Sequence, residues 1–267
     1  MEKRFKFGSN WAKYSEKLTQ HQLIVAQKSL EEIFGKDGLI GKSFLDVGCG
    51  SGIFSIAAIE LGAKKVVSFD FDPISVETTI QNAKMSLINR ECEFTAFQGD
   101  VLDHDLMLTL KHFDVVYSWG VLHHTGQMWN AIASAASFLK PNGRLLISIY
   151  NDQGWKSKLW KVIKRSYVSS PKAVRFLILI ACFLRLWAPT IIRDFFRYKS
   201  PHSWKSYADR RGMSPWIDLV DWVGGYPFEV AKSDSVIQYL KKYQFKPIQT
   251  KLVGQGLGCN EFLFVRQ

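Results

Sequence analysis

The chain has 267 residues, 47% of them hydrophobic and 14% aromatic, enough for one large packed domain or two smaller ones. Its four cysteines, Cys49, Cys92, Cys182 and Cys259, lie far apart without a CxxC pair, which argues against a zinc site or a disulfide framework and favours a reducing cytoplasm. The N-terminal MEKRFKFGSNWAKYSEK lacks the apolar core of a secretory signal, so we do not expect export.

The net charge of +11 is concentrated in one segment. Residues 151–215 contain fourteen Lys and Arg but only three Asp, and the rest of the chain is formally neutral. Clustered positive charge attracts the phosphates of nucleic acid, anionic lipid or a charged substrate. A solvated basic face without a ligand is the alternative.

Apolar runs of strand length alternate with amphipathic helical patterns from residue 43 to 150, which is typical of a parallel sheet covered on both faces. A helix is expected before this unit at 11–34. The patterns predict strands at 43–49, 65–70, 92–99, 113–119 and 143–150, with helices at 52–62, 73–88, 103–111 and 127–139. Near the C-terminus they predict a helix at 233–243 and strands at 246–253 and 260–265, close enough for an antiparallel hairpin.

Between these parts, residues 151–225 form the least regular stretch, rich in Trp, Lys and Arg. Within it, residues 176–184 form a nine-residue apolar run flanked by Arg175 and Arg185. A membrane span needs about 20 apolar residues, so this run is too short to cross a bilayer. Two interpretations remain: a lid over the substrate, which we favour, and a basic interfacial helix on a membrane surface.

The sequence LDVGCGSG places three glycines, Gly48, Gly50 and Gly52, between the first strand and the helix after it. Glycine permits a positive φ and lets a ligand approach the main chain, and a helix N-terminus presents free N–H groups. The spacing is GxGxG, with Asp46 two residues ahead, and differs from the GxGxxG of dinucleotide-binding proteins.

Two acids follow at strand ends. Asp70 ends the second strand, where its carboxylate could accept hydrogen bonds from both hydroxyls of a ribose. Gly99 and Asp100 close the third strand, where a second acid could lie near an adenine amine.

Taken in this order, DVGCGSG, Asp70, Gly99-Asp100 and FDVVYSWGVLHH resemble the class I S-adenosylmethionine-dependent methyltransferases, over about residues 40–150 and again in the terminal hairpin. The resemblance implies an α/β, Rossmann-like sheet of seven strands in the order 3-2-1-4-5-7-6 with the last strand antiparallel. The expected parts are an N-terminal helical flap (1–42), the S-adenosylmethionine-binding core (43–150), a helical, basic, aromatic-rich cap inserted after strand 5 (151–225), and a helix and hairpin completing the core (226–267).

The same resemblance implies a set of cofactor-binding residues. Asp46, Gly48 and Gly50 would lie along the methionine moiety of S-adenosylmethionine, Asp70 would hold the ribose, and Asp100 and Val101 would flank the adenine. The full expected set is Asp46, Gly48, Cys49, Gly50, Gly52, Asp70, Phe71, Asp100, Val101, Trp119 and Trp11. Trp11 would belong to a flap over the donor, or else pack on the core.

The class of methyl acceptor is narrowed by the end of the fourth strand. The stretch LGAKKVVSFDFDP is similar to ribosomal-protein methyltransferases, but the NPPY or DPPY tetrapeptide of their relatives, which holds a planar amide or base amine, is absent. The ending YSWGVLHH instead resembles small-molecule O-methyltransferases of the quinone-biosynthesis type, in which a histidine follows this strand.

Histidine titrates in the range that suits removal of a hydroxyl proton, so His124 and His123 are the candidate catalytic residues, with His124 favoured. Capping the following helix is the alternative role. Candidate substrate-binding residues border the same crevice: Tyr150, Asn151, Tyr226, Glu229, Asn260 and Glu261.

No spacing of His, Cys, Asp and Glu suggests a metal site. The leading hypothesis is therefore methyl transfer from S-adenosylmethionine to a small-molecule acceptor, lipid-like or anionic, most simply at a hydroxyl oxygen. An RNA or other macromolecular acceptor bound by the basic segment, and a nucleotide-binding protein without turnover, are the alternatives. A cytoplasmic protein without a transmembrane segment is expected, and peripheral membrane contact remains open.

Overall fold

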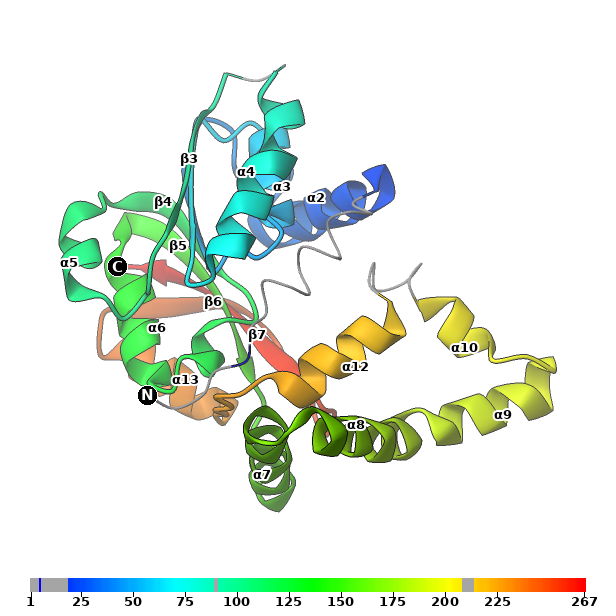
Figure 1. Cartoon of the computed structure of the whole chain (residues 1–267). Helices are drawn as coiled ribbons and strands as arrows, with labels where there is room; N and C mark the ends of the chain where they lie inside the picture. The colour runs from blue at the N-terminus through cyan, green and yellow to red at the C-terminus, as the bar shows by residue number, and fades with distance from the viewer. Residues whose placement is uncertain (1–4, 6–18, 89–90, 208–213) are drawn as a thin grey trace. The chain divides into compact units, whose positions relative to one another are not determined.

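The computed structural model describes residue 5 and residues 19–88, 91–207 and 214–267. The chain forms two compact units (Figure 1). We call Phe7–Gln153 with Glu229–Gln267 the core unit, and Met1–Lys6 with Gly154–Phe228 the helical unit. The cap predicted at 151–225 corresponds to the helical unit, whose inserted part begins and ends three residues later.

The core unit contains one seven-stranded sheet in the order β3-β2-β1-β4-β5-β7-β6. Its strands are β1 (Ser43–Val47), β2 (Lys65–Asp70), β3 (Glu93–Gln98), β4 (Phe113–Ser118), β5 (Leu139–Tyr150), β6 (Phe245–Lys251) and β7 (Cys259–Arg266). Strands β1 to β5 pair parallel with one another, whereas β7 pairs antiparallel with both β5 and β6. The predicted strand order and terminal hairpin are confirmed.

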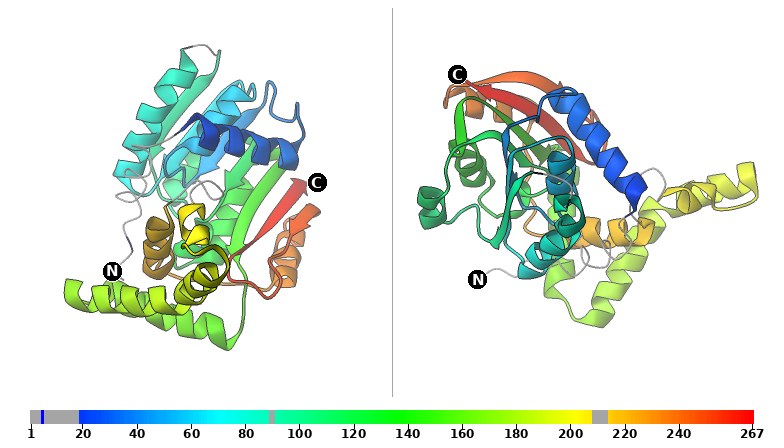
Figure 2. Two further views of the ribbon diagram at one scale, coloured as in Figure 1. Left: turned by 90° about the vertical axis from the view of Figure 1, so that its right-hand side faces the viewer. Right: turned by 90° about the horizontal axis from the view of Figure 1, so that it is seen from above.

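Helices cover both faces of this sheet (Figure 2). They are α2 (Gln20–Phe34), α3 (Ile53–Glu60), α4 (Pro73–Leu87), α5 (His104–Thr109), α6 (Met128–Ser137) and α13 (Ser233–Lys241), with a 3-10 turn η1 (Leu122–His124). Leu30 and Ile56 from α2 and α3 pack against one face, and Ile132 and Val236 from α6 and α13 against the other. Because both faces are covered, every residue of β1 is buried, including the polar Ser43 and Asp46.

The N-terminal flap predicted at 1–42 falls partly outside the described residues. Its described helix, α2, begins after Thr19, whose hydroxyl accepts the backbone N–H of Gln22 in a capping box. The helix belongs to the core unit.

A polar cluster ties together the amino-terminal region of β1, the start of β4 and β5. The carboxylate of Asp114 accepts hydrogen bonds from the backbone N–H (2.8 Å) and hydroxyl (2.6 Å) of Ser43 and from the ammonium of Lys140 (3.0 Å). Burial raises the pKa of the Asp114 carboxyl, but these hydrogen bonds outweigh burial and lower it from 3.8 to about 2.

The helical unit contains α7 (Trp155–Ser169), α8 (Lys172–Leu186), α9 (Ala188–Tyr198), α10 (His202–Lys205) and α12 (Pro215–Gly224). The prediction that this stretch is the least regular part of the chain is wrong. Its prolines do not interrupt helices, because each lies at a helix start: Pro171, Pro189, Pro201 and Pro215 occupy N-cap or first-turn positions. A missing N–H costs nothing in the first turn, since that group has no partner within the helix.

The unit is held together by aromatic contacts on the inner sides of its helices. Trp187 lies edge-on to Trp204 and Tyr207, and Phe183 lies edge-on to Trp204. The ammonium of Lys164, fully buried, donates to the carbonyl of Trp222 and lies 4.1 Å from the centroid of its ring. Among the described residues, no single helix is long and apolar enough to cross a bilayer, and α8 and α9 qualify only as a pair bent by 46°.

Candidate active site

The glycine loop follows β1 at the carboxyl end of the sheet. Gly48, Gly50 and Gly52 have φ values of 80°, 56° and 77°, which side chains with a Cβ rarely adopt. A Cβ on Gly48 would lie 2.4 Å from Cγ2 of Val121, and one on Gly52 would lie 2.7 Å from Cγ2 of Thr79. Gly48 and Gly52 are therefore required by backbone conformation and by close packing inside the protein.

The amides of this loop are bonded within the protein. The N–H groups of Gly48 and Cys49 donate to the carbonyl of Phe69 at 2.8 and 3.1 Å, and the N–H of Gly50 donates to Oδ2 of Asp70 at 3.0 Å. These three N–H groups therefore have hydrogen-bond partners within the protein. They fasten the loop to the end of β2.

Helix α4 supports the glycine loop through two side-chain hydrogen bonds. The hydroxyl of Thr79 donates to the carbonyl of Gly50 (3.3 Å), and the amide of Asn82 donates to the carbonyl of Ser51 (2.8 Å). These residues come about thirty positions after the loop, and no local pattern marks them.

Asp46 is buried beneath the loop. Its Oδ2 accepts a 2.5 Å hydrogen bond from the hydroxyl of Ser55, whose oxygen lies 2.8 Å from that of Ser68. Burial raises the pKa of Asp46 to about 7; the hydrogen bond from Ser55 lowers it and the nearby carboxylate of Asp70 raises it further. Asp46 therefore has an internal partner in Ser55, and its contact with the methionine moiety stays a prediction.

Asp70 lies at the end of β2 beside the loop. Oδ1 accepts the backbone N–H of Asp72 at 2.9 Å and Oδ2 that of Gly50, while the side chain remains partly exposed. Burial raises the pKa of this carboxyl, and the backbone N–H groups of Asp72 and Gly50 oppose that shift. A carboxylate oxygen has two lone pairs, so both oxygens can still accept ligand hydroxyls. The side chain of Phe71, next in sequence, is exposed.

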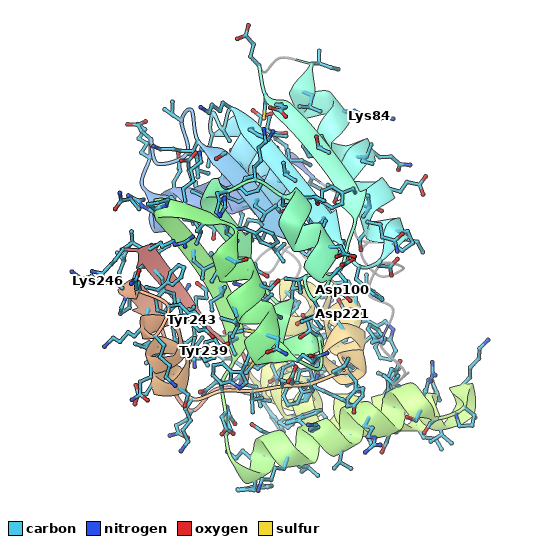
Figure 3. All side chains as sticks on the ribbon, turned by 90° about the vertical axis from the view of Figure 1, so that its left-hand side faces the viewer. Lys84, Asp100, Asp221, Tyr239, Tyr243 and Lys246 are labelled. Carbon is cyan, nitrogen blue, oxygen red and sulfur yellow. The ribbon has the colours of Figure 1, made fainter. Side chains whose placement is uncertain are left out.

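Asp100 and Val101 follow β3 (Figure 3 labels Asp100). Oδ1 of Asp100 accepts the N–H of Leu102 at 2.9 Å, and the carboxylate remains partly exposed. Val101 is buried, and its carbonyl accepts the hydroxyl of Ser134. The side chain of Val101 therefore supports the core.

The turn after β4 carries the two histidines into an aromatic cluster with Tyr150. The ring centroid of His123 lies 4.0 Å from that of Tyr150 and 4.5 Å from that of His124. The ring centroids of His124 and Tyr150 are 5.5 Å apart. His123 is fully buried with its Nδ1 3.2 Å from the carbonyl of Ser148, whereas His124 is partly exposed. Of the two histidines, only His124 has a ring that solvent or a ligand can reach.

Two residues predicted for separate roles are bonded to each other. The indole N–H of Trp119, expected near the cofactor, donates to Oε1 of Glu261, expected near the substrate, at 3.1 Å. The adjacent N–H of Gly120 donates to the hydroxyl of Ser148 at 2.7 Å. These bonds hold the end of β4 to β5 and β7, and the indole of Trp119 remains partly exposed.

The candidate substrate residues Asn151 and Asn260 brace the loop between β6 and β7. Oδ1 of Asn260 accepts the N–H of Val253 (3.0 Å), and its amide donates to Oδ1 of Asn151 (3.2 Å). The amide of Asn151 donates in turn to the carbonyl of Gly254 (2.7 Å). Asn260 is buried, so its contacts are internal ones.

Glu229 likewise has internal contacts. Its Oε2 accepts the N–H of Met128 at the start of α6, and its own N–H donates to the carbonyl of His123, both at 3.0 Å. It therefore ties the returning chain to the histidine turn. Tyr226 is buried in the helical unit, and Trp11 lies outside the described residues. Within the described part of the chain, no group of three or more His, Cys, Asp and Glu could hold a metal ion.

Known proteins with similar sequences and folds are methyltransferases. The family model of ribosomal protein L11 methyltransferase (PrmA) matches residues 26–155. The ribosomal protein L11 methyltransferase of Photobacterium profundum is 32% identical over 126 residues, covering 45% of this chain and 37% of that protein. The ubiquinone biosynthesis O-methyltransferase of Actinobacillus pleuropneumoniae is 24% identical over 225 residues, covering 84% of this chain and 79% of that protein.

Among solved structures, magnesium protoporphyrin IX methyltransferase from Synechocystis PCC 6803 with bound SAH superimposes with a TM-score of 0.58 at 17% identity, covering 97% of this chain and 94% of that one. The chain spans about two fifths of the length of the first curated relatives that it matches. By its sheet order and by these similarities, the chain belongs to the class I S-adenosylmethionine-dependent methyltransferases.

Proposed function

We propose that the protein transfers a methyl group from S-adenosylmethionine to a small-molecule acceptor, at a hydroxyl oxygen. The observation that carries the proposal is the contact between two loops. Val121, in the turn that leads to His124, packs so closely on Gly48 that any side chain at position 48 would collide with it. An in-line displacement needs donor and acceptor side by side, and this packing joins the glycine loop to the histidine turn.

The residues at the ends of β1, β2 and β3 fit the donor. The carboxylate of Asp70 would accept the ribose hydroxyls while holding the loop through Gly50, and Asp100 would lie on the adenine side. These groups lie at the point where the strand order reverses, between β1 and β4, which is where open α/β sheets bind ligands. Bound there, S-adenosylmethionine would supply an electrophilic methyl group on its sulfonium.

The histidine turn fits a hydroxyl acceptor. His124 is partly exposed and its ring orientation is limited by the rings of His123 and Tyr150, so its imidazole is positioned to take the acceptor proton. His123, whose Nδ1 faces the carbonyl of Ser148, would fix that arrangement.

Two observations support a small molecule over a protein or nucleobase. The fourth strand ends in SWGVLHH where an amide or base-amine methyltransferase of the related type would carry NPPY. The similarity to the Actinobacillus ubiquinone biosynthesis O-methyltransferase extends over 84% of the chain, whereas the L11 methyltransferase model stops at residue 155. The region beyond residue 155 holds the helical unit.

Donor binding is tested by calorimetry with S-adenosylmethionine and its demethylated product. Asp70→Asn should weaken both by about tenfold or more, the scale of losing hydrogen bonds to a charged group. Asp234→Asn, which changes an exposed acid on α13, is the matched control and should bind like the parent protein. Absence of heat with either ligand on folded parent protein would refute the proposal.

Turnover is tested with radiolabelled methyl donor and three separate acceptor pools: phenolic small molecules, ribosomal protein L11 and RNA. The proposal expects label in the small-molecule pool, with His124→Gln lowering kcat by about a hundredfold while donor affinity stays unchanged. Label in L11 or RNA alone would assign a macromolecular acceptor. Donor binding without any labelled product would favour a binding protein.

A further inference from the structure

One surface of the helical unit combines exposed apolar side chains with positive charge. From Gln153 to Arg193 the chain has nine Lys and Arg and no Asp or Glu. These residues cover α7, α8 and the first half of α9, which follow one another along the unit (Figure 1). We call the outward side chains of these three helices the apolar-basic surface.

Helix α8 exposes its apolar residues along one stripe. Ala173, Phe176, Leu177, Ala181 and Leu184 recur at spacings of three and four, which places them on one side of a helix, and all five are exposed. Phe176 and Leu177 are 58% and 65% exposed. None of the residues that the structure describes in the helical unit covers this stripe.

The opposite side of α8 faces the interior of the unit. Leu179 and Cys182 are the residues of α8 that are buried, and Phe183 packs on the ring of Trp204. The exposed stripe is therefore not needed to hold the unit together.

The neighbouring helices extend the same character. On α9, Ile192, Phe195 and Phe196 are exposed, Phe196 at 82%. On α7 the exposed apolar and cationic residues are Trp155, Lys156, Lys158, Leu159, Lys161, Val162 and Arg165. Aromatic, aliphatic and cationic side chains on one surface are the composition of helices that lie in a membrane interface.

Helices α7, α8 and α9 contain a single acidic residue, and its side chain is buried. Asp194 of α9 is buried, and its carboxylate accepts hydrogen bonds from the backbone N–H (2.5 Å) and hydroxyl (3.0 Å) of Ser203. Because the Asp194 carboxylate is buried while the lysines and arginines of these helices are mostly exposed, the charge on the apolar-basic surface is positive.

We propose that the apolar-basic surface docks on an anionic lipid membrane, with α8 and α9 lying along it. The charge decides against a second copy of the chain, because two such surfaces would repel one another. A membrane is favoured over RNA because a lipid interface would bury the exposed aliphatic side chains Leu177, Leu184 and Ile192, whereas RNA could use only the exposed rings and cations. Helices of 15 and 11 residues match an interfacial position rather than a span of about 20 residues. The proposal is independent of methyl transfer.

The test is sedimentation of the full chain with vesicles of phosphatidylcholine, alone or with about one third phosphatidylglycerol. The apolar variant is Leu177→Ser with Phe196→Ser, and the charge variant is Lys158→Gln with Lys161→Gln. The matched control is Ile40→Ser with Ile88→Ser, two similarly exposed residues of the core unit. All variants change exposed side chains, and their thermal unfolding is compared with that of the parent chain.

The parent chain should prefer anionic over neutral vesicles, and added salt should reduce that preference. The charge variant should bind about fivefold more weakly for each cation removed. The apolar variant should bind about tenfold more weakly or worse, while the control binds like the parent.

Four outcomes would overturn the proposal. They are no binding to anionic vesicles; equal binding to neutral and anionic vesicles; equal binding by the apolar variant and the control; and binding that resists both high salt and alkaline carbonate, which would indicate insertion. Light scattering without lipid adds a check, because self-association that the apolar variant abolishes would assign the surface to a second copy.

Discussion

Replacing Asp46 by Asn should remove a pH dependence from the stability of the core unit. The carboxyl of Asp46 is buried beneath the glycine loop, and burial raises its pKa from 3.8 to about 7. Between these two values the folded protein holds a proton that the unfolded chain has released. The contribution to the free energy of unfolding is therefore fully present below the unfolded pKa and is lost as the pH rises through the folded pKa.

The magnitude follows from the shift. About three pKa units at about 1.4 kcal/mol each give roughly 4 kcal/mol in total, of which about 3 kcal/mol is lost between about pH 5 and about pH 8. Asn stays neutral throughout, and its amide oxygen can accept the hydroxyl of Ser55 as the carboxyl does. The free energy of unfolding of the parent minus that of Asp46→Asn should therefore fall by about 3 kcal/mol between about pH 5 and about pH 8.

The assay is urea unfolding at several pH values, followed by hydrogen exchange of peptides from β1 and β2, because the chain has two units and a global signal would mix them. Ser55→Ala is an informative control. It removes the hydrogen bond that lowers the pKa of Asp46, so the loss of stability should shift to higher pH. Parallel stability curves for the parent and Asp46→Asn would refute the assignment.

Two further predictions concern the glycine loop and the amino-terminal side of the sheet. Gly48→Ala should destabilise the protein by about 2–4 kcal/mol, from the positive φ and the collision with Val121, and adding Val121→Ala should recover the collision part in a double-mutant cycle measured by urea unfolding. Asp114→Asn should make stability less dependent on pH in acid. Folding lowers the pKa of Asp114 from 3.8 to about 2, so the parent protein loses this stabilisation as the pH falls through that range. Acid unfolding curves from circular dichroism that are equally steep for both proteins would contradict this prediction.

Local patterns in the sequence predicted most of the elements of the core unit. Alternation of apolar runs and amphipathic stretches located the strands of the core unit to within a few residues, and the family resemblance supplied the strand order that the structure confirms. A helical cap was expected at residues 151–225, but its prolines and tryptophans make the local sequence pattern look irregular and hide the bounds of the individual helices. The role of these prolines and tryptophans depends on whether they fall at a helix start or on a packed face, as Pro189 and Trp187 do.

The candidate site was predictable as a location but not in its bonds. Glycines after one strand and an acid at the end of the next lie at one sheet edge whenever the strands are parallel neighbours, so Gly50 and Asp70 could be placed together from the sequence. The sequence does not predict the hydrogen bonds themselves. It gives no sign that the Asp70 carboxylate accepts the N–H of Gly50, or that Asn260 bonds to Asn151 and Val253.

The sequence by itself determined which elements form, which faces they bury and which chemical groups stand at strand ends, because these depend on spacing over a few residues. Only the tertiary structure decided which polar atoms find partners. Asp46 faces Ser55, Gly48 meets Val121, and the stripe around Leu177 points outward. Each of these depends on how elements pack against, or leave uncovered, one another, and no short-range pattern encodes that.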